Sequence, residues 1–145
     1  MNKSKLKEFF MCTRPHSYPA SIAPVLFGAT YALGNEIKFS ILKFILFLLA
    51  CLLIQAATNL FNEYYDYKHG LDKIDSEGIS GSIVKGNLSS KEVMNGALVL
   101  YGLAFVLGLI LISLVTHILL FDINNINSRA QWLMTVIPAL WEAKA

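Results

Sequence analysis

The sequence predicts an all-α integral membrane protein, a helical bundle with three transmembrane helices. Hydrophobic residues make up 55% of its 145 residues and charged residues only 15%, well under the roughly 25% of a soluble domain. The mean hydropathy is +0.54. Three apolar segments, residues 17–33, 39–61 and 93–121, approach the roughly 20 residues that a spanning helix needs.

The first span, residues 17–33, contains two prolines, Pro19 and Pro24. Pro24 removes a backbone hydrogen bond inside the helix, so we expect a kink or a widening there. Gly34 and Asn35 follow as a turn signal that ends the span.

The second span, residues 39–61, changes character in its last third. Gln55, Asn59, Asn62 and Asp66 recur at spacings of 4, 3 and 4 residues, which places them within roughly 60° of one another on a helix. Polar groups that face lipid are costly. This polar stripe is therefore expected to face a bundle interior or a wet cavity.

An acidic segment follows the stripe, and half of the ten acidic residues lie between residues 63 and 77. Gly70 is expected to end the helix. On a continued helix Asp72 would point about 120° away from Asp66, but a chain reversal at Gly70 could return it to the same site.

The third span, residues 93–121, begins after a capping box formed by Ser89 and Glu92. Residues 122–145 are polar and then moderately apolar, with Pro138 near the end. We expect two parts: residues 1–121 as the membrane domain, and 122–145 as an unrelated, poorly ordered tail.

Topology follows from the basic residues. They cluster before the first span and between the second and third, at Lys3, Lys5, Lys7, Arg14, Lys68, Lys73, Lys85 and Lys91. The positive-inside rule then places the N-terminus and residues 62–92 in the cytoplasm, at the cell membrane. The net charge of +2 is too small to indicate a nucleic-acid partner. The three apolar spans indicate that the chain is surrounded by membrane lipid.

The acidic segment offers hard oxygen ligands, which suit Mg²⁺ or Ca²⁺. Its spacing fits neither an EF-hand nor a P-loop. Asn62, Asp66 and Asp72 are the expected ligands of a Mg²⁺ ion that holds a diphosphate, with Asp66 and Asp72 as the catalytic carboxylates. Such a site at the mouth of a bundle suits an amphiphile such as a polyprenyl diphosphate.

Three further residues are candidates for substrate contact: Arg14, Asn59 and Lys85. Each also has a simpler interpretation. Arg14 could snorkel to the interface, Asn59 could hydrogen-bond a neighbouring helix, and Lys85 could serve only to fix topology. Glu63 points about 80° off the stripe and is not expected to bind the metal.

Two segments, TRPHSYPASIAPVLFGATYAL and ATNLFNEYYDYKHGLDKIDSEGISGSIVKGNLS, resemble the start of the 1,4-dihydroxy-2-naphthoate polyprenyltransferases of menaquinone synthesis. These enzymes are UbiA-type intramembrane prenyltransferases. The resemblance covers about residues 13–121. It implies a fragment of a nine-helix fold, a Mg²⁺ cofactor, and transfer of a polyprenyl group to an aromatic acceptor, with loss of its carboxylate as CO₂.

The sequence departs from the family pattern in three ways. Glu63 replaces the first aspartate of the commoner motif, and Asp72 arrives late, as in the naphthoate branch. The second aspartate-rich motif, which the family uses to hold more Mg²⁺, is missing. The tail SRAQWLMTVIPALWEAKA resembles a translated Alu-type repeat, so we expect a truncated or chimeric chain that is inactive alone.

Two other functions stay open at this point. One is a non-catalytic membrane fragment, inert or an assembly partner. The other is a small membrane protein that binds or transports a divalent cation. Six more spans and a second aspartate motif at the same genomic locus would favour the enzyme.

Overall fold

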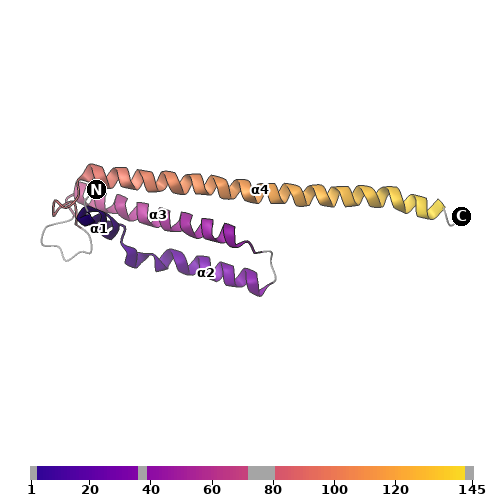
Figure 1. Cartoon of the computed structure of the whole chain (residues 1–145), viewed down its shortest axis with the longest axis horizontal. Helices are drawn as coiled ribbons and strands as arrows, with labels where there is room; N and C mark the ends of the chain where they lie inside the picture. Colours follow the sequence, from indigo (N-terminus) through magenta and orange to yellow (C-terminus); the bar gives the residue numbers. More distant parts are fainter. Residues whose placement is uncertain (1–2, 36–38, 72–80, 143–145) are drawn as a thin grey trace. The chain divides into compact units, whose positions relative to one another are not determined.

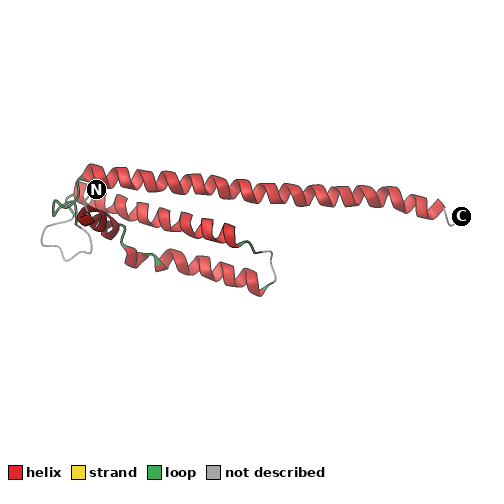
Figure 2. Ribbon diagram, viewed as in Figure 1, coloured by secondary structure: helices red, strands yellow, loops and turns green. Residues whose placement is uncertain are grey.

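The computed structural model of the chain is built from helices (Figures 1 and 2). It describes the backbone of residues 3–35, 39–71 and 81–142, and the side chains there except those of residues 3, 4, 119 and 128–142. The elements are α1 (Lys3–Cys12), η1 (Pro15–Ser17), α2 (Pro19–Gly34), α3 (Ile41–Lys68) and α4 (Ser90–Glu142). These ranges contain no strand, which confirms the all-α prediction.

Helix α1 was not expected from the sequence pattern, because ten residues with few apolar positions are too short to be stable alone. Tertiary contacts hold it. Lys5 Nζ lies 3.0 Å from Glu92 Oε1 at the start of α4, and the Phe9 ring packs against Gly96. Helix α1 also contacts α3 (Figure 1).

Helix α2 carries Pro19 in its first turn and Pro24 in its interior. It ends at Gly34, where the Asn35 side-chain amide donates to the Tyr31 carbonyl oxygen at 2.9 Å. Helices α2 and α3 lie side by side (Figure 1). At 16 residues α2 is apolar but shorter than a full span.

Helix α3 begins at its N-cap, Ser40, whose hydroxyl accepts from the Lys43 N–H at 3.5 Å. It ends at Lys68, and Gly70 follows with a φ of +68°, a conformation that glycine adopts without strain. The Leu71 N–H closes the end on the Asp66 carbonyl at 2.9 Å. The predicted stop at Gly70 is confirmed.

Helix α4 starts with the predicted capping box. The Glu92 N–H donates to Ser89 Oγ at 3.2 Å, and the Ser89 N–H donates to Glu92 Oε2 at 2.9 Å. The helix runs to Glu142, beyond the expected end at Phe121. Residues 122–137 contain neither Gly nor Pro, so nothing local stops it. The nature of residues 122–145 as an unrelated tail stays a prediction.

Among the described residues, two helices are long and apolar enough to cross a membrane: α3, and residues 90–127 of α4. The chain divides into two compact units, Met1–Gly108 and Leu109–Ala145. The second unit is the later part of α4 with the chain end. The first unit contains the other elements and the predicted site residues that the structure describes.

A small core lies in the first unit, where α1, the end of α3, the turn before α4 and the first turns of α4 meet. Its buried members are Cys12, Leu60, Ile83, Leu88, Val93 and Ala97, with Phe9, Phe61, Tyr64 and Leu100 packed against them. Elsewhere large apolar side chains are exposed, such as Phe27 at 74%. The ordered packing is therefore concentrated beside the polar end of α3.

Candidate functional site

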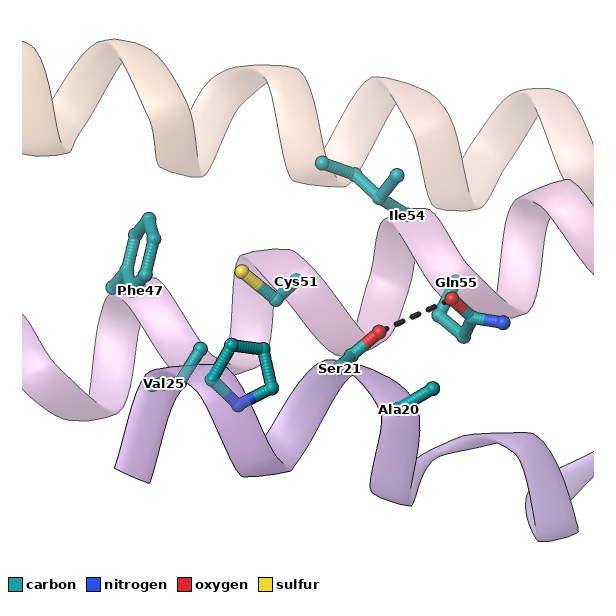
Figure 3. A pocket seen from close by; sticks show the side chains of 8 residues that line it. Ala20, Ser21, Val25, Phe47, Cys51, Ile54 and Gln55 are labelled. Carbon is teal, nitrogen blue, oxygen red and sulfur yellow. Dashed lines mark hydrogen bonds between the residues drawn. The ribbon is translucent and has the colours of Figure 1, made fainter. Parts of the chain in front are cut away.

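The N-terminal part of the polar stripe, Gln55 and Asn59, hydrogen-bonds residues in and around η1 and in the first turn of α2. Ser21 Oγ donates to Gln55 Oε1 at 3.1 Å (Figure 3), and Gln55 Nε2 donates to Ser17 Oγ at 3.2 Å. Asn59 Nδ2 donates to the Thr13 carbonyl at 2.7 Å and to Ser17 Oγ at 2.9 Å. Gln55 and Asn59 thus turn toward protein, as their spacing indicates.

Asp66, at the C-terminal end of the stripe, lies beside Arg14. Arg14 Nη2 lies 3.8 Å from Asp66 Oδ2, with the two side chains 26% and 34% exposed. Arg14 has a φ of 51°, which costs a non-glycine residue about 1–3 kcal/mol. Ser17 offsets this strain, since its N–H and its hydroxyl both donate to the Arg14 carbonyl, at 2.9 and 2.8 Å. The turn therefore holds a guanidinium beside the carboxylate.

Asn62 lies on the same stripe one helical turn before Asp66, and its side chain is exposed. One carboxylate and one amide oxygen match what Mg²⁺ takes from a protein when phosphate and water complete its shell. Within residues 3–35, 39–71 and 81–142 no three His, Cys, Asp or Glu side chains could hold a metal. Asn62 and Asp66 therefore fit a metal site that phosphate and water complete, rather than one built from protein ligands alone.

Three sequence-predicted residues remain outside this arrangement. Asp72, predicted as a metal ligand, lies outside the described residues, as does Asp75 of the same acidic segment. Lys85 is exposed on the turn before α4, and its contact with substrate stays a prediction. Asn59 is 5% exposed and its amide nitrogen donates to Thr13 and Ser17, and its contact with substrate stays a prediction.

An apolar groove of about 480 Å³ runs between α2 and α3 from the Ser21–Gln55 pair (Figure 3). Its other walls are apolar: Ala20, Pro24, Val25, Phe47, Cys51 and Ile54. Polar groups are thus confined to one end of the groove. An amphiphile with a polar head and a hydrocarbon tail matches this distribution.

Glu63 is the site residue that sequence reasoning missed. It is fully buried, and its Oε1 accepts from the Gly81 N–H at 2.9 Å and from the Ile83 N–H at 3.5 Å. Its Oε2 is buried with no hydrogen-bond partner in the described part of the chain. A signal existed, since Ala56, Leu60 and Glu63 share a buried face at spacings of 4 and 3.

A second carboxylate, Glu8 of α1, binds the same turn. Ser82 Oγ donates to Glu8 Oε2 at 3.0 Å and Asn87 Nδ2 donates to it at 3.3 Å. Cys12 is buried in the same cluster as Ile83 and Leu88 of this turn. Burial raises the pKa of Cys12 to about 11, and the nearby Glu63 and Glu8 charges add to the rise.

Known proteins were compared with the sequence. The UbiA prenyltransferase family matches residues 21–123. The 1,4-dihydroxy-2-naphthoate octaprenyltransferase of Bacillus subtilis (strain 168) is 49% identical over 96 residues, covering 66% of this chain and 30% of that protein. The Haemophilus influenzae protein of the same name is 32% identical over 117 residues, 79% of this chain and 37% of its own length.

A vertebrate relative is also similar. UbiA prenyltransferase domain-containing protein 1 of Danio rerio is 32% identical over 99 residues, which is 68% of this chain and 29% of that protein. No solved structure matches. The chain thus spans between 29% and 37% of the length of these relatives.

Proposed function

The chain belongs to the UbiA prenyltransferase family, and from this premise we propose that it contributes part of the site of a 1,4-dihydroxy-2-naphthoate polyprenyltransferase. Proteins of this family act on a prenyl substrate and an aromatic acceptor in membranes. The apolar helices and the family membership together support an integral membrane protein. The proposed donor is a polyprenyl diphosphate, and the proposed pathway is menaquinone biosynthesis.

One observation carries the proposal: the Arg14–Asp66 pair stands at the end of a polar stripe that leads to an apolar groove. A diphosphate head would bind beside Arg14, Asn62 and Asp66. The hydrocarbon tail would follow the stripe past Gln55 into the groove between α2 and α3. The positive-inside distribution of Lys and Arg supports placing the head on the cytoplasmic side.

The proposed cofactor is Mg²⁺, held by Asn62 and Asp66, with Asp72 as the third ligand predicted from the sequence. When bound, the ion would act as a Lewis acid that stabilises charge on the leaving diphosphate. Arg14, which pairs with Asp66 in the structure, would turn toward the diphosphate oxygens. A guanidinium suits this role because its donors match phosphate geometry.

The proposed reaction exchanges one bond for another at the first carbon of the prenyl chain. The C–O bond to the diphosphate breaks, and both electrons leave with the diphosphate. A ring carbon of the naphthoate attacks and forms the new C–C bond. The carboxylate on that ring carbon departs as CO₂, and its bonding electrons restore the aromatic ring. The residues of this chain bind and orient the head group rather than donate a proton.

A chimera tests the proposal. It would join residues 1–121 to the remaining C-terminal part of the Bacillus subtilis relative, which is 49% identical over 96 residues. We expect prenylated product from polyprenyl diphosphate, dihydroxynaphthoate and Mg²⁺. A folded chimera that prenylates another aromatic acid but not dihydroxynaphthoate would overturn the assigned acceptor.

The alternatives left open by the sequence gain no support. The acidic residues that a stand-alone divalent-cation protein would add, Asp72 and Asp75, lie outside the described residues, so this alternative stays a prediction. A fragment without any role in prenyl transfer leaves the Arg14–Asp66 pair beside the stripe without a purpose.

A further inference from the structure

The turn between residues 81 and 88 is compact and internally bonded. The Lys85 N–H donates to the Gly81 carbonyl at 2.9 Å, and the Asn87 and Leu88 N–H groups donate to the Ser82 carbonyl at 2.9 and 3.2 Å. Gly81 has a φ of +105°, which a residue with a side chain rarely adopts. Lys85 is thus part of one small folded unit.

Two carboxylates from different helices bind this turn. Glu63 of α3 accepts from the Gly81 and Ile83 backbone N–H groups, and Glu8 of α1 accepts from the side chains of Ser82 and Asn87. Hydrogen bonds to an ionised acceptor are roughly twice as strong as those between neutral groups. The turn is therefore fastened to the helix that carries Asp66.

Glu63 is the more informative of the two acids because it is fully buried. A buried carboxylate is costly, and an apolar side chain of similar volume often gives equal or greater stability. Its advantage here is geometric, since one oxygen can receive two backbone N–H groups from the turn. Glu63 also lies only three residues before Asp66 on α3.

We propose that Glu63 is a positioning residue: its buried carboxylate fixes the turn of residues 81–88, and with it Lys85, at the end of α3 that carries Asp66. Lys85 is exposed there. In addition to Arg14, it is available as a second cation for a diphosphate. Only this last role of Lys85 rests on the proposed function. The clamp itself rests on the contacts of Glu63.

Cys12 gives a natural reporter, because its buried thiol packs in the same cluster as Ile83 and Leu88 of the turn. The whole chain, carrying Cys51→Ser, is reconstituted in liposomes and treated with N-ethylmaleimide. Glu63→Ala should raise the rate of Cys12 alkylation roughly tenfold, since the turn then opens more often. Glu63→Gln keeps an oxygen acceptor and should restore most of the protection.

Asp122→Asn is the control, a carboxylate on α4 far along the sequence from the turn, and should leave the alkylation rate unchanged. Far-UV circular dichroism shows whether Glu63→Ala keeps its helices, and the rate in denaturant gives the upper limit. Equal alkylation rates for Glu63→Ala and the parent chain would overturn the clamp.

Spin labels measure the position of Lys85 directly. The chain carries His69→Cys and Lys85→Cys, with Cys12 and Cys51 replaced by alanine, and the distance distribution between the labels is recorded. We expect one narrow distribution in the parent, a broad one after Glu63→Ala, and narrowing again with Glu63→Gln. A narrow, unchanged distribution in Glu63→Ala contradicts the positioning role, because loss of stability alone would not be rescued by the amide.

The two proposals fail in different ways. Binding of Mg²⁺ with inorganic diphosphate that is unaffected by Asp66→Asn counts against the proposed function and leaves the clamp standing. Alkylation and label distances that ignore Glu63→Ala count against the clamp and leave the metal site standing.

Discussion

Asp66 is the carboxylate whose loss is expected to cost the most activity. In the chimera, Asp66→Asn keeps the shape of the side chain but removes the charge that Mg²⁺ requires. Because the metal contributes several kcal/mol to the transition state, kcat should fall by orders of magnitude. Asp72→Asn should be nearly as harmful, and Asp75→Asn should cost no more than roughly tenfold, or about 1.4 kcal/mol.

The measurement is prenyl transfer across a Mg²⁺ titration, because a weakened metal site should partly recover at high metal concentration. Asp75→Asn serves as the control acid. If Asp75→Asn cripples the enzyme while Asp66→Asn is mild, the metal does not lie on the stripe and the argument from helical spacing is wrong.

Cys12 should titrate far above an ordinary thiol. Burial raises its pKa from 9.0 to about 11, so at pH 8 the folded chain holds about a hundredfold less thiolate than the unfolded chain. In the Cys51→Ser chain, alkylation of Cys12 should keep rising up to pH 11, whereas in denaturant it should level off near pH 9. A folded profile that levels off near pH 9 would contradict the burial of this thiol.

The raised pKa of Cys12 also makes the stability of the fold depend on pH. Because the folded state binds the Cys12 proton more tightly, its contribution is fully present below pH 9.0 and is lost as the pH rises toward about 11.

The residues of the stripe show what sequence can and cannot give at this scale. Gln55 and Asn59 were placed correctly because helical spacing alone decides which side chains share a face. Glu63 was missed because its partners, the N–H groups of Gly81 and Ile83, are 18 and 20 residues away. The spacing of Ala56, Leu60 and Glu63 indicates that Glu63 lies on the buried face of α3, but no local pattern indicates which distant turn it binds.

At the scale of elements, the signals that were predicted are local ones. The capping box of Ser89 and Glu92 and the stop at Gly70 each depend on a few neighbouring residues. Helix α1 depends on Lys5–Glu92 and on Phe9 against α4, so composition could not reveal it. Helix α4 continues past its predicted end because a fall in hydropathy at residue 122 does not by itself end a helix.

Gly96 lets α1 approach α4. A Cβ at this position would collide with the Phe9 ring, whereas a Cβ at Gly102 meets nothing within 4 Å. Gly96→Ala should therefore displace α1 and speed tryptic cleavage at its lysines. Gly102→Ala, on the same helix, should leave cleavage unchanged and stabilise the helix by up to about 1 kcal/mol.

Limited proteolysis of the reconstituted chain distinguishes the two glycine variants. Cleavage of α1 that is equally slow in both variants would show that the Phe9 ring rotates away freely and that the contact does not fix α1.

At the scale of the whole molecule, the first prediction concerns the orientation of the chain in the membrane. From the basic residues before α2 and between α3 and α4 we predict that both segments lie on the cytoplasmic side. Single cysteines at Lys73 and Asn35 test this in cells with an impermeant thiol reagent. Position 35 should react from outside and position 73 only after permeabilisation. Reaction of position 73 alone from outside would invert the topology.

The last expectation concerns the 145-residue chain by itself. It spans 30% of the Bacillus subtilis relative, and in the described part of it large apolar side chains such as Phe27 and Phe105 are 74% and 67% exposed. We expect helices this exposed to leave a bound diphosphate in contact with water, and exclusion of water is what strengthens charge stabilisation at such a site. We therefore expect no prenyl transfer by the chain alone.

The assay uses the purified chain in liposomes with Mg²⁺, geranylgeranyl diphosphate and dihydroxynaphthoate, and the chimera as the positive control under identical conditions. Product should form with the chimera and stay at the no-protein background with the chain. The two proteins differ only beyond residue 121, because Arg14, Asn62 and Asp66 are the same in both. Turnover by the chain clearly above background would mean that its helices and the tyrosines near Asp66 shield the diphosphate without further cover.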